Sequence, residues 1–176
     1  MKYTPSTESI PQSSRRAVNK KLLYLIDNNC CEAYGITKQD VFQGYTGDGG
    51  LHGLSRKNYR SYHTYSEAKK ELENGQFFTP PALCQFVADC LRLEEDDLVA
   101  DLTCGMGNFF NVMPVEANVY GCELDTKAFK VASYLYPEVN LVNKDIRNYM
   151  PQVRFDYVVG NPPFNLQWMA ENGKEY

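Results

Sequence analysis

The tetrapeptide Asn161-Pro162-Pro163-Phe164 has the residue types needed to hold a planar group that carries an amino substituent. It follows an apolar run, residues 155–159, whose β-branched residues are typical of a buried strand. The Asn161 side-chain oxygen and the Pro162 carbonyl can accept the two hydrogens of an NH2 group, and Phe164 offers a ring for stacking. Neither proline has an N–H that would compete for these acceptors. An ordinary strand-ending turn is the competing interpretation, because Asn-Pro is common in turns.

A glycine loop follows another apolar run, in the segment from Asp101 to Gly107. Gly105 and Gly107 allow a tight turn and a close approach of the backbone to a ligand. The third glycine of a dinucleotide fingerprint would fall at Phe110, and no Gly-Lys-Ser/Thr follows the loop. The loop therefore predicts a nucleoside ligand without phosphates, with Asp101 available to hold a cationic amino group.

Acidic residues end the next two apolar runs. Glu123 can bind both hydroxyls of a ribose, and Asp145 can accept a hydrogen bond from an adenine amino group. Asp125 is instead expected to cap the helix that begins at Thr126. A nucleoside with an amino-acid tail and a cationic sulfonium fits this set, which identifies S-adenosyl-L-methionine as the expected cofactor.

The elements that must position these residues alternate between strand and helix, which predicts an α/β fold with a parallel, doubly wound sheet. Right-handed crossovers, with the chain reversing after the third strand, give the order 3-2-1-4. Ligands bind where the strand order reverses, so the glycine loop and Asn161 should face each other. The expected strands are residues 98–102, 118–122, 139–142 and 155–159, and the helix between the second and third covers 126–136.

The chain before the sheet divides into an expected disordered arm, residues 1–12, and a small helical region, residues 13–75, ahead of a partial catalytic domain at 76–176. Thr37 and Asp40 are spaced as a capping pair for a short helix. Thr79 is the expected N-cap of the helix that leads into the sheet, with Pro80 at its first position. The basic and tyrosine-rich stretch 56–65 is either a grip for nucleic acid or a solvated connector.

Composition narrows the class of protein. The net charge of −4 argues against wholesale wrapping of nucleic acid, although residues 1–75 carry 11 Lys/Arg against 8 Asp/Glu. The six cysteines include no C-x-x-C pair, so we expect reduced thiols of a cytoplasmic protein and no metal site. No apolar run approaches the roughly 20 residues of a membrane span, so no membrane partner is expected.

The ordered motifs resemble those of N6-adenine DNA methyltransferases, as found in type I modification subunits and fused restriction–modification enzymes. The resemblance runs from Gln76-Phe77-Phe78-Thr79-Pro80-Pro81 through Asp101–Gly107, Glu123 and Asp145 to Asn161–Phe164, about residues 75–165. It implies a Rossmann-like, S-adenosylmethionine-dependent core and adenine-N6 methylation of DNA. The segment at 50–57 also resembles large mobile-element proteins that carry a methylase and a helicase-like region.

The resemblance implies a role for each matched residue. Phe77, Thr79 and Pro80 would contact the methionine end of the cofactor, together with Asp101, Thr103 and Gly105. Glu123 would hold the ribose and Asp145 the cofactor adenine. Asn161 and Pro162, followed by Pro163, would orient the target amino group, and Phe164 would stack on a base flipped out of the DNA helix.

Three alternatives to DNA methylation remain at this point. The same fold and motif can serve an RNA base or a protein glutamine, and a methylase-like domain can act as a non-catalytic scaffold. An NAD-binding oxidoreductase is the third, and Phe110 disfavours it. The family fold needs further strands and a DNA-reading region, so we expect a fragment that binds cofactor weakly or not at all and lacks sequence-specific methylation alone. Its partners would be DNA and the rest of the same polypeptide, or a second copy paired through the fourth strand's edge.

Overall fold

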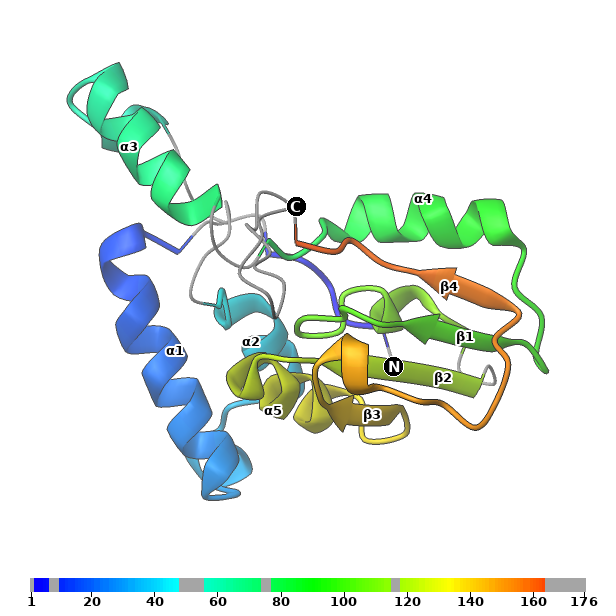
Figure 1. Cartoon of the computed structure of the whole chain (residues 1–176). Coiled ribbons are helices and arrows are strands. Elements are labelled where there is room, and N and C mark those ends of the chain that lie inside the picture. Colours follow the sequence, from blue (N-terminus) through cyan, green and yellow to red (C-terminus); the bar gives the residue numbers. More distant parts are fainter. Residues whose placement is uncertain (1, 7–9, 48–55, 74–76, 115–117, 164–176) are drawn as a thin grey trace.

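The computed structural model describes residues 2–6, 10–47, 56–73, 77–114 and 118–163. Its centre is a parallel sheet of four strands in the order β3-β2-β1-β4, which confirms the predicted order (Figure 1). Each strand begins and ends within two residues of its predicted bounds. The strands are β1 Leu98–Asp101, β2 Asn118–Glu123, β3 Asn140–Asn143 and β4 Tyr157–Val159.

The register of the sheet places the strand ends together. Asp101, the last residue of β1, pairs with Gly121 of β2 on one side and with Val159 of β4 on the other. Val99 and Ala100 of β1 are fully buried, as expected for the central strand of a parallel sheet. The loops that leave β1 and β4 therefore start side by side at the carboxyl edge.

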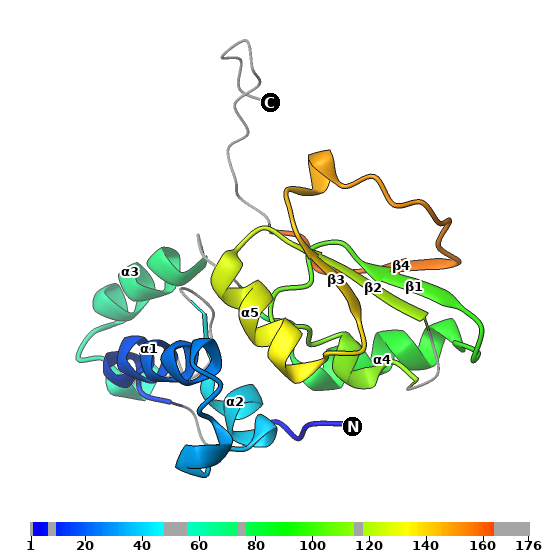
Figure 2. The ribbon, with the colours of Figure 1, turned by 90° about the horizontal axis from the view of Figure 1, so that it is seen from below.

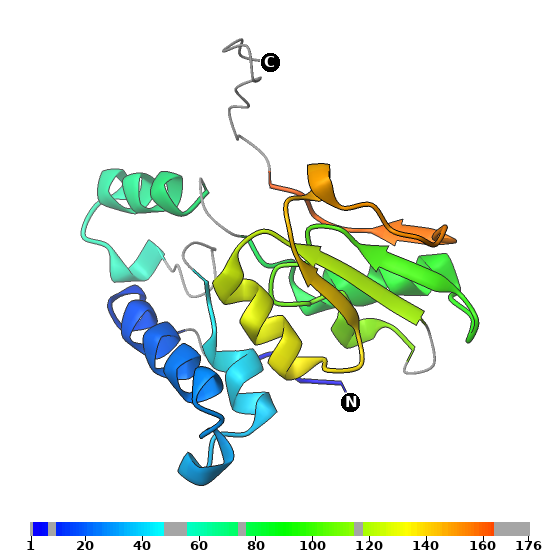
Figure 3. The same cartoon turned by 60° about the horizontal axis from the view of Figure 1, so that its bottom comes forward.

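The two longer helices of the sheet region, α4 (Pro81–Leu91) and α5 (Thr126–Leu135), lie on the same face of the sheet (Figures 2 and 3). The opposite face is crossed by the connection from β3 to β4, which contains the short 3-10 helix η4 (Ile146–Asn148). The chain therefore winds over both faces, as predicted for a doubly wound sheet, although no longer helix among the described residues covers this second face. Val158 of β4 is accordingly 61% exposed.

The N-terminal helices share one hydrophobic core with the sheet region. Helices α1 (Gln12–Asp27) and α2 (Lys38–Gly44) pack against α5, and α3 (Tyr62–Glu73) projects beside them (Figure 1). A continuous cluster of buried side chains joins Leu25 and Val41 to Val131. Helices α1 and α2 and the sheet therefore form one packed body among the described residues.

The prediction that residues 1–12 form a disordered arm does not describe Tyr3. The Tyr3 backbone N–H donates to Asn111 Oδ1 at 2.6 Å, and its hydroxyl donates to the Leu135 carbonyl at 2.8 Å. Its ring packs at 5.5 Å from those of Phe42 and Tyr136, and only 6% of the residue is exposed. A single aromatic side chain with partners for its polar atoms is enough to dock a polar segment.

Helix starts follow the predicted capping in two cases and differ in one. Thr37 and Asp40 form a reciprocal capping box on α2, and Asp125 accepts from the N–H groups of the first turn of α5. Helix α4 starts one residue later than predicted: Pro80 is its N-cap, and no side chain caps it. Thr79 therefore lies before the helix, and its carbonyl is available to other partners.

Short 3-10 turns occur between some of these elements. The glycine loop is followed only by the 3-10 helix η3 (Phe110–Val112), and two more 3-10 turns occur at Glu32–Tyr34 and Arg56–Asn58. No helix among the described residues is long and apolar enough to cross a membrane.

Candidate active site at the carboxyl edge of the sheet

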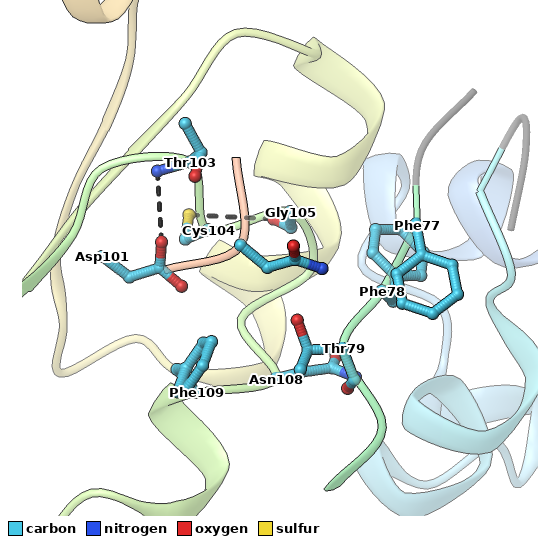
Figure 4. A pocket seen from close by; sticks show the side chains of 10 residues that line it. Phe77, Phe78, Thr79, Asp101, Thr103, Cys104, Gly105, Asn108 and Phe109 are labelled. Atoms are coloured by element: carbon cyan, nitrogen blue, oxygen red, sulfur yellow. Dashed lines mark hydrogen bonds between the residues drawn. The ribbon is translucent and has the colours of Figure 1, made fainter. Parts of the chain in front are cut away.

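A pocket lies where the loops after β1 and β4 leave the sheet (Figure 4). Its empty space is about 250 Å³, a figure that includes open solvent. Predicted and unpredicted residues line it together. The predicted ones are Phe77, Thr79, Asp101, Thr103, Gly105 and Asn161, and the others are Phe78, Cys104, Asn108 and Phe109.

Asp101 is a buried carboxylate at the base of the pocket, with 2% of the residue exposed. The Thr103 backbone N–H donates to its Oδ1 at 3.1 Å. Burial raises the pKa of the Asp101 carboxyl to about 7; the Thr103 hydrogen bond opposes the rise and the nearby Glu123 carboxylate adds to it. A carboxylate with so little solvation is stabilised by any cation that enters the pocket.

Gly105 has a positive φ of 57°, and a Cβ there would stand 2.9 Å from the Phe78 ring. Its backbone N–H donates to Glu123 Oε2 at 2.7 Å, so the glycine loop is tied to the end of β2. Gly107 also has a positive φ, 88°, but it does not line the pocket. A Cβ on Gly107 would lie 2.6 Å from Phe110 and 2.8 Å from Tyr136, so internal packing explains this glycine.

The Glu123 carboxylate is held by two backbone amides, from Gly105 to Oε2 and from Asp125 to Oε1, both at 2.7 Å. Burial raises the pKa of the Glu123 carboxyl, and these two hydrogen bonds oppose the rise. Each carboxylate oxygen has a second lone pair, so the side chain can still accept two hydroxyl hydrogens. The structure thus fixes the orientation of Glu123 just beside the pocket.

Asp145 follows β3 and caps η4 by accepting from the Arg147 N–H at 2.9 Å. The Arg147 guanidinium also holds both of its oxygens, with Nη2–Oδ2 at 2.6 Å. The Arg147 hydrogen bonds lower the pKa of the Asp145 carboxyl. Sequence reasoning did not anticipate this contact, which occupies the acceptor predicted for the cofactor adenine.

The segment 77–80 is attached to the glycine loop through its backbone. The Thr79 carbonyl accepts from Asn108 Nδ2 at 2.7 Å and lies 3.7 Å from the Cys84 sulfur, which donates to it. Phe77 and Thr79 therefore form one wall of the pocket, whereas Pro80 starts α4 and does not line it. No sequence pattern indicated Asn108, because its link to the site is a hydrogen bond to Thr79, 29 positions earlier in the chain.

At the other wall, Asn161 comes two residues after the end of β4. Pro162 and Pro163 follow it as exposed residues that do not line the pocket. Phe164, predicted to stack on a base, lies outside the described residues. The structure therefore brings Asn161 together with Asp101 and Gly105, as the strand order required, and leaves the two prolines at the rim.

The sequence is similar to two proteins named for restriction systems and to trans-aconitate 2-methyltransferase of Escherichia coli O157:H7, which is 31% identical over 83 residues, 46% of this chain and 32% of that protein. A family model described as N-6 DNA Methylase matches residues 61–176. A type I restriction enzyme methylase subunit of Methanocaldococcus jannaschii is 29% identical over 132 residues, which is 62% of this chain and 22% of that protein. Defense against restriction protein B of Escherichia phage P1 is 24% identical over 157 residues, 85% of this chain and 6% of that protein. The chain thus spans about a fifth of the Methanocaldococcus jannaschii protein and less of the phage protein.

A solved structure assigned as a modification subunit of a type I restriction enzyme from Vibrio vulnificus is also similar. It shares 19% identity with a TM-score of 0.46, over 65% of this chain and 31% of the other. At these values the similarity adds nothing beyond the strand topology described above.

Proposed function

The chain belongs to the N-6 DNA methylase family, and from this we propose that it holds the cofactor and catalytic motifs for methylating the N6 amino group of adenine in DNA. The cofactor of the family is S-adenosyl-L-methionine, which supplies, when bound, a methyl group on a sulfonium. The observation that carries the proposal is that Asp101 and Asn161, 60 positions apart (161 − 101), line one pocket. A cation-binding acid and an amine-orienting amide are the two things that methyl transfer to an amino group requires.

The residues present fit this cofactor. Asp101 is buried and poor in donors, which suits the ammonium group of the methionine end. Glu123 has its carboxylate fixed by two amides and keeps lone pairs for a ribose diol. Asp145 would accept from the adenine amino group after its Arg147 partner moves aside.

The chain's part in the reaction is to bind and orient the amino group. The Asn161 side-chain oxygen and the Pro162 carbonyl would accept its two hydrogens, which draws the nitrogen lone pair out of conjugation with the ring. These acceptors also stabilise the positive charge that develops on the nitrogen. Positioning supplies much of the remaining acceleration, and the mechanism uses no general base. Phe164 would stack on the flipped base, as the motif predicts.

The test follows a labelled methyl group. The chain, in molar excess over labelled S-adenosylmethionine, is incubated with unmethylated DNA, with RNA or with protein, and digested products are separated. Label in N6-methyladenine of DNA supports the proposal. Label in RNA would instead indicate an RNA base as the substrate, and label in protein glutamine would indicate a protein amide.

Binding is measured in parallel by calorimetry with S-adenosylmethionine and with NAD. Binding of the former without any transfer would favour a scaffold module, and binding of NAD alone would overturn the methyltransferase assignment. That the 176 residues alone bind the cofactor weakly or not at all and lack sequence-specific methylation stays a prediction, and these two assays also test it.

A further inference from the structure

Asn108 is a buried side chain in the pocket wall whose oxygen has no partner. The residue is 6% exposed, and its Nδ2 donates to the Thr79 carbonyl at 2.7 Å. Its Oδ1 is buried and accepts no hydrogen bond from the residues that the structure describes. Figure 4 shows Asn108 beside Thr79, between the glycine loop and the segment that precedes α4.

The free atom is an acceptor, and the geometry fixes this. Turning the amide over would set its oxygen against the Thr79 carbonyl oxygen and lose the 2.7 Å bond. A buried oxygen without a donor is costly, so native structures either pair such atoms or use them. Asn108 Oδ1 is therefore a buried acceptor to which none of the described residues donates.

Asn111, a second buried asparagine in the same segment, has a purely structural role and serves as a comparison. It is 5% exposed, and both ends of its amide are paired with the Tyr3 backbone, at 2.6 Å and 2.8 Å. Asn108 has the same chemistry three residues earlier and only half of its partners. The difference between the two is that Asn108 lines the pocket with Asp101.

We propose that Asn108 Oδ1 accepts a hydrogen bond from the α-ammonium group of the cofactor's methionine end, beside the counter-charge of Asp101. This inference rests on the proposed function and adds a binding residue to its site. An ammonium group has three N–H donors, so one can reach Asn108 while another faces the Asp101 carboxylate. Hydrogen bonds between a charged donor and a buried acceptor are the stronger kind.

The test compares two ligands that share a nucleoside and differ in the amine. S-adenosylhomocysteine carries the amino-acid end, and 5′-methylthioadenosine lacks it. Dissociation constants are measured by NMR titration of the whole chain, which reaches millimolar values. For Asn108→Leu we expect the constant for S-adenosylhomocysteine to rise about tenfold or more, with less than a twofold change for 5′-methylthioadenosine.

Asn108→Asp keeps the acceptor, loses the donor to Thr79 and sets its second oxygen against the Thr79 carbonyl, so we expect a lower midpoint of thermal unfolding. The ratio of its two dissociation constants should stay within about threefold of the wild-type ratio. Asn111→Leu is the matched control: we expect a lower midpoint of thermal unfolding with the ratio of the two constants unchanged.

Two results would overturn the inference while the proposed function stands. In the first, Asn108→Leu raises the dissociation constants of both ligands by the same factor. In the second, Asn108→Asp loses as much amine-dependent affinity as Asn108→Leu. Either result would mean that Asn108 only ties the loop to Thr79. If the wild type binds neither ligand, the proposed function fails, and the role of Asn108 fails with it. Retained binding of 5′-methylthioadenosine reports that each variant is folded.

Discussion

Gly160 and Asp101 approach each other across neighbouring strands so closely that a Cβ on Gly160 would stand 3.1 Å from Asp101 Oδ1. Asp101 ends β1, and Gly160 directly follows β4. The absence of a side chain at 160 therefore leaves the space in which the carboxylate sits. The same contact joins the side of the pocket formed by Asp101 and the glycine loop to the side formed by Asn161.

Gly160→Ala should displace the Asp101 carboxylate and remove what solvation it retains. We expect cofactor affinity to fall about tenfold, and the free energy of unfolding to fall by about 1–3 kcal/mol, the usual cost of overpacking. Calorimetry and denaturant titration measure the two effects. Val158→Ala, at an exposed position of the same strand, is the control and should change either quantity little. Unchanged affinity in Gly160→Ala would mean that the carboxylate has room to move without loss.

Asp101 should make stability depend on pH. Its folded pKa of about 7 lies above the ordinary value of 3.8, so the folded state holds the proton more tightly than the unfolded state. The stabilisation is fully present below about pH 4 and is lost as the pH rises toward 7, on the order of 4 kcal/mol at most. Asp101→Asn should therefore flatten the fall in unfolding free energy across this window, measured by denaturant titration.

The pKa of Glu123 is also raised and Glu123 titrates in both proteins, so both profiles should fall, and the difference between them reports Asp101 together with its coupling to Glu123. Identical pH profiles for the wild type and Asp101→Asn would contradict the raised pKa. A steeper fall in the wild type would support it.

Glu123→Ala removes the carboxylate that accepts from the amides of Gly105 and Asp125. Two partly buried N–H groups are left without a partner, which costs about 1–3 kcal/mol for each that water does not reach. We expect a lower thermal midpoint and at least a tenfold loss of affinity for S-adenosylmethionine, because the ribose acceptor is gone. Unchanged binding by calorimetry would remove Glu123 from the cofactor site.

Arg147→Ala should release the Asp145 carboxylate from the guanidinium that now occupies it. Since the Arg147 side chain is 62% exposed and solvent screens the pair, stability should change by less than about 1 kcal/mol. Affinity for S-adenosylmethionine should rise severalfold if Asp145 accepts from the adenine, and Asp145→Ala should lower it. Lys144→Ala, which removes a neighbouring exposed cation, separates this effect from a general change in charge.

Asn161→Ala should abolish methyl transfer while leaving cofactor affinity within about threefold. Its amide is proposed to contact the target amino group and not the cofactor, so its loss should affect the reaction far more than cofactor binding. Transfer of labelled methyl groups and calorimetry on the same preparation check both parts. Equal loss of binding and transfer would instead place Asn161 in the cofactor site.

The sequence by itself determined the strand order of the sheet, and with it the proximity of the loops that follow β1 and β4. Strand and helix patterns repeat at short spacing, and short right-handed connections leave few ways to order four parallel strands. The glycine loop after β1 and Asn161 after β4 had to become neighbours once that order was set. Local signals also determined the caps at Thr37 and Asp125, because each cap bonds only to residues two or three positions away.

Only the tertiary structure decided which side chains met across long separations. Tyr3 is hydrogen-bonded to Asn111, 108 positions later, and the Asn108 side-chain NH2 donates to the Thr79 carbonyl, 29 positions earlier. Gly107 is required by the ring of Tyr136, which no loop pattern could indicate. The physical reason is that hydrogen-bond and packing partners are chosen after the chain collapses, when burial makes every unpaired group costly. Patterns along the chain indicate which residues are buried, but not which atoms they contact in the folded protein.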